Sequence, residues 1–225
     1  MKYFSPAFFK FLDELSKNNN KEWFDANRHR YESDVKQPFK KLVEDLTAKL
    51  SKEIPELNQQ VHKAIFRINR DKRFSKDKSP YKNNVAAVFS RKGTQDIDFP
   101  GFYIHIGSKE ILVGGGKYEV SKEHLAKIRQ EIYYNNSAFK KILNEKSFKE
   151  KYGKLDGDKN KVLPAEYKEF EKTQPYIANK QFWYHSALTR KEIMSDKLDI
   201  ILLSYFKAGM KMNKFLLEAI NSSQQ

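Results

Sequence analysis

Residues 63–82 read KAIFRINRDKRFSKDKSPYK, and the rest of the chain can be interpreted outward from this stretch. Its first residues continue an alternation of apolar side chains that predicts a strand over residues 61–68. On such a strand Ala64, Phe66 and Ile68 face the core, and Arg67 lies on the opposite face. The following residues, up to Lys82, predict a long loop after this first strand.

Positive charge is concentrated in this stretch. Its eight basic residues are Lys63, Arg67, Arg70, Lys72, Arg73, Lys76, Lys78 and Lys82. Within the stretch, the only acidic residues are Asp71 and Asp77. The whole chain of 225 residues has a formal net charge of +14. More than half of that excess lies in residues 61–92. We therefore expect an anionic partner here, either a phosphate-bearing small molecule or nucleic acid.

The segments around the stretch predict an α+β fold. Helices are expected from Ser5-Pro6, from about Lys21 with a restart at Pro38, from residues 121 and 137, and over 195–220. Strands are expected over 61–68, 85–89, 102–106, 111–113 and 181–185, and residues 145–172 predict a polar surface excursion with helical turns. Because helices flank a block of strands, we expect a mostly antiparallel sheet with N-terminal and C-terminal helices packed on it.

The composition predicts one domain over residues 1–225, because no linker-like segment interrupts the apolar periodicity. The absence of cysteine excludes disulfides and thiolate chemistry and fits a reducing compartment. The first residues contain no apolar signal segment, and no run approaches the roughly 20 apolar residues of a membrane span. We expect a cytoplasmic protein without a membrane segment.

Four motifs occur in a characteristic order along the chain. They are Asn18-Asn19-Asn20-Lys21-Glu22-Trp23-Phe24, the stretch from Phe66 to Lys82, Gly101-Phe102-Tyr103, and Gly114-Gly115-Gly116. With them the chain resembles, over nearly its whole length, the uncharacterised bacterial family catalogued as domain of unknown function 2461. The resemblance implies a single domain and no established activity. The family pattern also implies a basic Lys-Arg-x-Pro stretch and a His-Pro after residues 157–159, where this chain has Asn160-Lys161-Val162-Leu163-Pro164 and Gln174-Pro175.

The basic stretch is the candidate ligand site. The predicted ligand-binding residues are Arg67, Arg70, Arg73, Ser75, Lys76, Lys78, Tyr81 and Lys82. Arg67 and Arg73 would hold the anion, and Asp71 and Asp77 would orient them. Bidentate pairs are expected between these two carboxylates and Arg70 and Arg73. The alternative is an Arg–Asp network that only fixes an irregular loop, because structural ion-pair networks resemble binding sites.

Two further functions remain open on the sequence. One is an enzyme acting on a phosphorylated or carboxylated small molecule, with Asp71 or His105 as the acid–base group. The other is an interaction module whose basic face docks an acidic protein.

No cofactor or metal is expected. The five histidines, His29, His62, His105, His124 and His185, lack metal-ligand spacing. The glycines at 114–116 match neither a P-loop nor a dinucleotide fingerprint, and they predict a turn with positive φ that ends the second arm of a hairpin.

Overall fold

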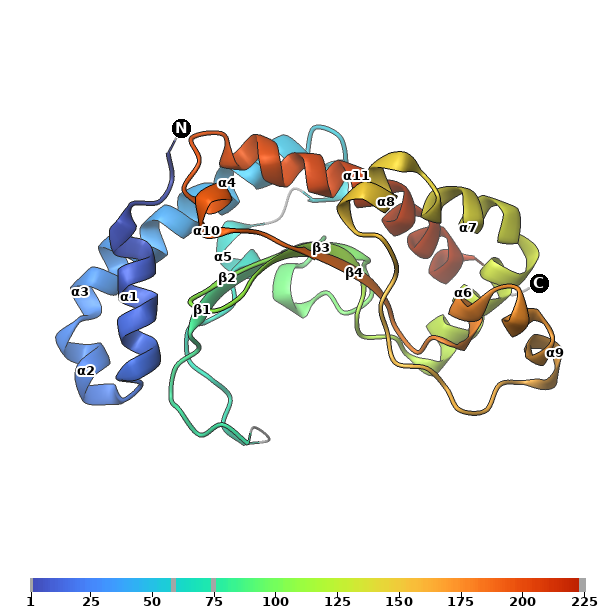
Figure 1. The fold of residues 1–225 in the computed structure, drawn as a ribbon, viewed down its shortest axis with the longest axis horizontal. Coiled ribbons are helices and arrows are strands. Elements are labelled where there is room, and N and C mark those ends of the chain that lie inside the picture. The colour runs from blue at the N-terminus through green and yellow to red at the C-terminus, as the bar shows by residue number, and fades with distance from the viewer. Residues whose placement is uncertain (1, 58–59, 74–75, 223–225) are drawn as a thin grey trace. The chain divides into compact units, whose positions relative to one another are not determined.

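The structure is a computed structural model that describes residues 2–57, 60–73 and 76–222. It confirms the α+β prediction: helices accompany an antiparallel sheet of four strands, in the order β1-β2-β3-β4 (Figure 1). The strands are β1 (Asn84–Phe89), β2 (Gly101–Gly107), β3 (Ile111–Lys117) and β4 (Phe182–Ala187). The predicted hairpin is formed by β2 and β3, and it is closed by a hydrogen bond from the Gly107 amide to the Glu110 carbonyl, 2.8 Å long.

The chain divides into two compact units. Unit 1 comprises Met1–Asp96, Tyr103–Val113 and Ala187–Leu203, and unit 2 comprises Ile97–Phe102, Gly114–Ser186 and Ser204–Gln225. Strands β2, β3 and β4 and helix α11 (Leu198–Asn221) each contain residues of both units. The expectation of one domain over residues 1–225 stays a prediction.

Short and long helices build most of unit 1. They are α1 (Pro6–Lys17), α2 (Lys21–Ala26), α3 (Arg28–Arg30), α4 (Gln37–Leu50), α5 (Val61–Ala64) and α10 (Arg190–Ile193), with a π-helical segment at Tyr31–Lys36 and 3₁₀ turns at Pro55–Leu57 and Gly93–Gln95. As predicted, α1 begins with Pro6 in its first turn and α4 restarts around Pro38, also in its first turn. Proline is tolerated there because the amides of a first helical turn have no partner within the helix.

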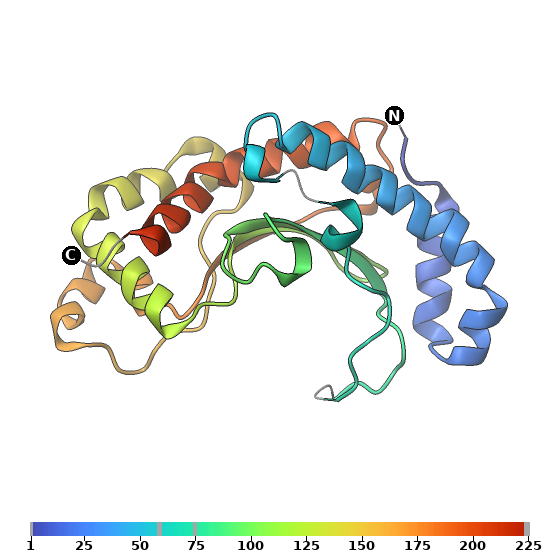
Figure 2. The ribbon, with the colours of Figure 1, turned by 180° about the vertical axis from the view of Figure 1, so that it is seen from behind.

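The predicted strand over residues 61–68 is wrong. Residues Val61–Ala64 form α5, which lies between α4 and β1 (Figure 2). Ala64 is completely buried, whereas His62 and Lys63 are exposed, so the apolar alternation reflects a helical turn with one buried side chain followed by extended chain. Beyond it, isolated antiparallel bridges join Ile65 to Ala87 and Asn69 to Tyr81. The basic stretch is therefore a long excursion before β1 and not a loop after a first strand.

The glycines at 114–116 lie inside β3 rather than ending it, so the expected end of the hairpin arm at these glycines is also wrong. A side chain at Gly114 would overlap the carbonyl oxygen of Tyr184, and one at Gly116 would overlap that of Phe182. Glycine lets β3 approach β4 this closely. The predicted positive φ occurs at Gly116, at 100°.

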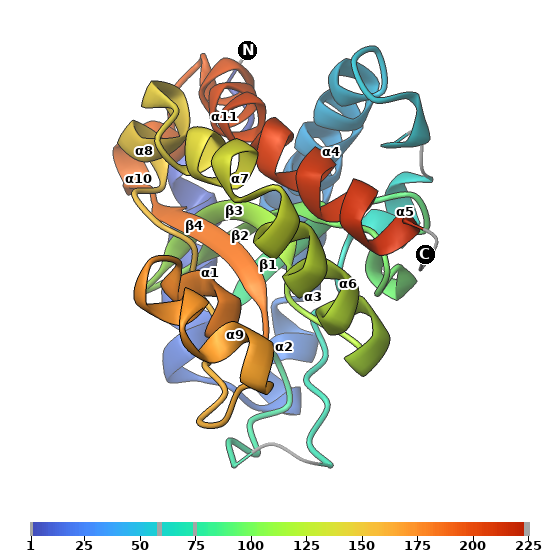
Figure 3. The same cartoon turned by 90° about the vertical axis from the view of Figure 1, so that its right-hand side faces the viewer.

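In unit 2, helices pack against the face of β4 that bears Phe182 and Tyr184. They are α6 (Lys122–Tyr134), α7 (Asn136–Leu143), α8 (Lys146–Lys151) and α9 (Ala165–Lys168), with 3₁₀ turns at Phe170–Lys172 and Pro175–Ala178. Helix α7 runs beside the C-terminal part of α11 (Figure 3), where the rings of Phe139 and Phe215 are 5.2 Å apart. The α6 prediction is confirmed, with the Ser121 hydroxyl accepting from the His124 amide as its N-cap.

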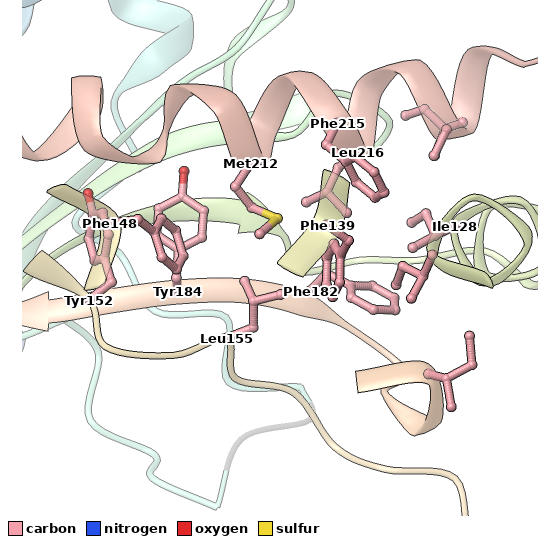
Figure 4. Close-up of a cluster of buried hydrophobic side chains, with 14 of the residues drawn as sticks. Ile128, Phe139, Phe148, Tyr152, Leu155, Phe182, Tyr184, Met212, Phe215 and Leu216 are labelled. Atoms are coloured by element: carbon pink, nitrogen blue, oxygen red, sulfur yellow. The ribbon is translucent and has the colours of Figure 1, made fainter. Parts of the chain in front are cut away.

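The core of unit 2 fills the space between α11 and β4 (Figure 4). Met212, Phe215 and Leu216 project from α11, and Phe182 and Tyr184 project toward them from β4. Residues 145–172 also contribute to this core, because Phe148, Tyr152, Leu155 and Leu163 are buried. The helical turns predicted for residues 145–172 are present. The segment is not a purely polar surface excursion, however, because these four apolar side chains are buried in the core of unit 2.

No helix of the described residues combines the length and the apolar character that a membrane span requires.

Candidate functional site

The basic stretch of unit 1 is held at its base by backbone pairing. The Arg70 amide donates to the Pro80 carbonyl at 2.9 Å, and the Lys82 amide donates to the Ile68 carbonyl at 2.8 Å. The two arms therefore run antiparallel from residue 65 outward, and residues 71–73 and 76–79 belong to the tip. Base and tip place the charged side chains in different surroundings.

At the tip, Asp71 and Arg73 form the expected bidentate pair. Arg73 donates from Nε to Oδ1 at 3.1 Å and from Nη2 to Oδ2 at 2.8 Å, and the Arg73 amide adds a third bond to the carboxylate. These bonds hold the pKa of Asp71 well below its usual value. Arg67 approaches the same carboxylate, with 3.9 Å between Nη2 and Oδ2. Asp71 stays ionised, which favours an orienting role over acid–base work.

A second pair lies closer to the base. Arg70 Nη2 is 3.0 Å from Asp77 Oδ2. The Ser79 amide, which donates to the Asp77 carboxylate, and the charge of Arg70 lower the pKa of Asp77. The Arg70 Nε atom is shut off from solvent and lacks a hydrogen-bond partner within the described part of the chain. One donor of this guanidinium is therefore left unsatisfied.

Tyr81 is a packing residue. Its ring stacks on that of Phe24 with 3.9 Å between centroids and 15° between planes, and the residue is 6% exposed. The Asn19 carboxamide pairs with its backbone, accepting from the Tyr81 amide at 3.0 Å and donating to the Tyr81 carbonyl at 2.9 Å. These contacts bring the first two sequence motifs together at the base of the stretch. The Asn19 contact was not predicted, although Asn19 lies in the conspicuous Asn-Asn-Asn run.

Lys82 lies at the base beside aromatic side chains. Its Nζ is 5.3 Å from the centroid of the Phe66 ring, and the Phe66 ring meets that of Tyr103 edge-on at 6.2 Å. Burial, followed by the charges of Arg67 and Arg70, lowers the pKa of Lys82. Within the described ranges no carboxylate pairs with its ammonium group. We call Phe66, Lys82, Tyr103 and His105 the Lys82 cluster.

His105 is the neutral member of this cluster. Tyr103 and His105 lie on the same face of β2, and the Tyr103 hydroxyl is 3.3 Å from His105 Nδ1. Burial lowers the pKa of His105 from 6.5, against a smaller opposing effect of Glu110. Burial also raises the pKa of Tyr103 to about 12. Both side chains are therefore uncharged at neutral pH.

The remaining predicted residues lie toward the tip. Lys76 and Lys78 are exposed, and Lys78 Nζ donates to the Lys72 carbonyl at 2.9 Å. Ser75 lies outside the described residues. The structure thus gathers Arg67, Arg70 and Lys82 near the base and leaves Arg73, Lys76 and Lys78 around the tip.

No group of three or more histidine and carboxylate side chains suited to a metal ion occurs in the part of the chain that the structure describes.

Comparison with known proteins gives one match. A family model described as "Conserved hypothetical protein (DUF2461)" matches residues 7–215. No curated protein and no solved structure matches the chain.

Proposed function

The chain belongs to the DUF2461 family, and from the charges of unit 1 we propose that it binds a phosphate-bearing ligand at the base of the basic stretch, between Arg67, Arg70 and Lys82. The single observation that carries the proposal is the state of Lys82. Its ammonium group is partly desolvated and repelled by two guanidinium groups, and no described carboxylate compensates it. A bound anion would remove both penalties.

The donor set suits a phosphate group. A guanidinium offers a planar fork that matches two phosphate oxygens, and an ammonium adds a compact point charge. Arg70 supports the proposal further, because its buried Nε has no hydrogen-bond partner among the residues that the structure describes. The Phe66 and Tyr103 rings provide an apolar flank for the rest of the ligand. The exposed Arg73, Lys76 and Lys78 add long-range attraction and extend the surface toward longer anions, including nucleic acid.

Calorimetric titration with inorganic phosphate, pyrophosphate and a short DNA duplex tests this proposal. We expect saturable binding of a phosphate compound that is weakened at least tenfold by Lys82→Met and by Arg67→Gln. The control is Lys21→Met, which removes the same charge from an exposed position in α2. Equal affinity of Lys82→Met and Lys21→Met for every phosphate compound would refute the site.

Salt dependence separates the two ligand classes. Duplex binding should weaken with a slope of about 0.9 per phosphate contact on a logarithmic salt scale, whereas a small phosphate compound held by few charges should show a shallow dependence. Binding of DNA alone, with a steep slope, would assign the site to nucleic acid.

A second candidate is an enzyme that uses the same ligand, with His105 as the acid–base group. It is favoured by the neutral imidazole of His105, which can accept a proton, beside the Tyr103 hydroxyl. Turnover of phosphorylated or carboxylated small molecules should be lost in His105→Gln while phosphate affinity is retained. Unchanged turnover in that variant would exclude His105.

A further inference from the structure

A second cluster of functional side chains lies in unit 2, on the face of β4 that points away from α11. Phe182 and Tyr184 of β4 are buried against the helices, so the alternating residues Trp183 and His185 lie on the opposite face. Both are only partly buried.

The chain brings a carboxylate to this face from a distant segment. Asp156 is joined to Trp183 by an isolated antiparallel bridge, in which the Asp156 amide donates to the Trp183 carbonyl at 2.7 Å. Cross-strand neighbours share a face, and a residue two positions along the strand is the diagonal neighbour. Asp156 therefore reaches His185, with 3.2 Å between Oδ2 and Nδ1.

Two contacts fix the imidazole ring. Its Nδ1 atom is shut off from solvent and lies close to the Asp156 carboxylate, although it makes no hydrogen bond of regular geometry with a described residue. The other Asp156 oxygen is 3.0 Å from Lys154 Nζ. The indole of Trp183 stacks on the ring, with 5.0 Å between centroids and 25° between planes. The ring is thus held at one edge and on one face.

This arrangement determines which nitrogen carries the proton. A carboxylate 3.2 Å from Nδ1 favours the tautomer in which Nδ1 is protonated, because its negative charge attracts the N–H group and repels a lone pair at that position. The lone pair is left on Nε2, and no partner of Nε2 occurs among the described residues. Since the His185 side chain is 38% exposed, this acceptor is available to a ligand.

An aromatic surface adjoins the pair. The Tyr118 ring contacts Trp183 edge-on at 5.9 Å and is 67% exposed. Such a ring offers an apolar contact to a ligand that also has a polar group.

We propose that His185, positioned by Asp156, forms a binding site in unit 2 for a small molecule that carries a hydroxyl group on a ring. His185 Nε2 accepts the hydrogen bond of the hydroxyl group, and Tyr118 contacts the ring. The site consists of unit 2 residues alone and is independent of the phosphate site proposed for unit 1.

Nuclear magnetic resonance of protein with ¹⁵N-labelled histidine tests the geometry. Long-range correlations of the neutral imidazole should show His185 with its proton on Nδ1, assigned by loss of the signals in His185→Gln. Asp156→Asn should move the proton to Nε2, because the carboxamide can donate to Nδ1 and the backbone bridge is kept. The matched control Asp158→Asn, two residues further along the same segment, should leave the tautomer unchanged. A proton on Nε2 in the parent protein would overturn the proposal.

Chemical modification tests access and ligand binding. Diethyl pyrocarbonate reacts with unprotonated imidazole nitrogens, and peptide mass spectrometry resolves the individual histidines. We expect rapid modification of His185 in the parent protein and in Asp158→Asn, and a severalfold slower rate in Asp156→Asn. Phenol, the simplest ring with a hydroxyl group, should protect His185 but not the exposed His29 and His62. Failure of phenol to protect His185 would refute the ligand assignment.

Discussion

Asn19 pairs with Tyr81 in the way that a neighbouring strand would. Its side-chain oxygen accepts from the Tyr81 amide at 3.0 Å, and its side-chain nitrogen donates to the Tyr81 carbonyl at 2.9 Å and to Asn83 Oδ1 at 2.8 Å. A single carboxamide thereby connects the α1–α2 turn to the base of the basic stretch. It supplies the acceptor for the Tyr81 amide and the shorter of the two bonds to the Tyr81 carbonyl, which also accepts from Arg70 Nη2 at 3.4 Å.

Replacing this carboxamide should destabilise the protein. Asn19→Ala removes the partner of the Tyr81 amide and leaves the Tyr81 carbonyl only the 3.4 Å bond from Arg70 Nη2. We therefore expect a loss of about 1–3 kcal/mol in the free energy of unfolding. Denaturant titration measures it. The control is Asn18→Ala, which removes one exposed bond to the Glu14 carbonyl and should have a much smaller effect. Equal stability of the two variants would show that the Asn19 contact contributes nothing.

Lys82→Met should not destabilise the protein when no anion is present. Because the pKa of Lys82 is below 10.5 in the folded state, the unfolded chain binds more protons between that lower value and 10.5. The contribution of Lys82 to the free energy of unfolding is therefore least favourable at pH values where its side chain is charged. It rises with pH between the lowered folded pKa and 10.5. Unfolding at neutral pH, with and without phosphate, measures the difference. A clear loss of stability in Lys82→Met without phosphate would mean that the charge is compensated.

His105 should contribute to acid sensitivity. Its folded pKa is below the ordinary 6.5, so the unfolded state binds the proton first as the pH falls. The stability from keeping His105 neutral is complete above pH 6.5 and declines as the pH falls from 6.5 through the lower folded pKa. His105→Gln should have a flatter stability profile in this window. His29→Gln, which changes an exposed histidine, is the control, and parallel profiles for parent and His105→Gln would contradict the prediction.

A larger residue in place of Gly209 in α11 should destabilise the protein, because the Tyr184 side chain lies against this position. A methyl group at this position would overlap the Tyr184 hydroxyl oxygen and come within 2.6 Å of the ring atoms Cζ and Cε2. We expect Gly209→Ala to cost about 1–3 kcal/mol through overpacking, and a double-mutant cycle with Tyr184→Leu should recover part of that loss. Helix propensity alone predicts a gain of up to about 1 kcal/mol, so a stabilised Gly209→Ala would disprove the steric explanation.

The whole chain should unfold in one transition. Helix α11 and strands β2, β3 and β4 contain residues of both units, so unfolding of either unit would disrupt elements of the other. Calorimetry should show equal calorimetric and van't Hoff enthalpies. Limited trypsin treatment should cut first at the exposed Lys159 and Lys161, within the segment 145–172. Two transitions, or early cleavage between residues 50 and 62, would contradict the single-domain prediction.

The sequence alone was sufficient for features that depend on local patterning. Helix periodicity and first-turn prolines located α1 and α4, short apolar segments located β1, β2 and β4, and the order of elements predicted the antiparallel α+β class. The concentration of charge in residues 61–92 likewise needed only counting. These features depend on residues that are close together in the sequence, so they can be predicted from the local pattern of apolar, polar and charged residues.

Other features were decided by contacts between distant segments. Val61–Ala64 form α5 with Ala64 buried, and the glycines at 114–116 lie in β3, where β4 approaches too closely for a larger residue at 114 or 116. The separation of Lys82 from the carboxylates that pair with Arg70 and Arg73, and the pairing of Asp156 with His185, also exist only in the folded chain. Periodicity and charge counts describe each segment by itself, whereas burial and the partner that a side chain finds depend on residues far away in the sequence.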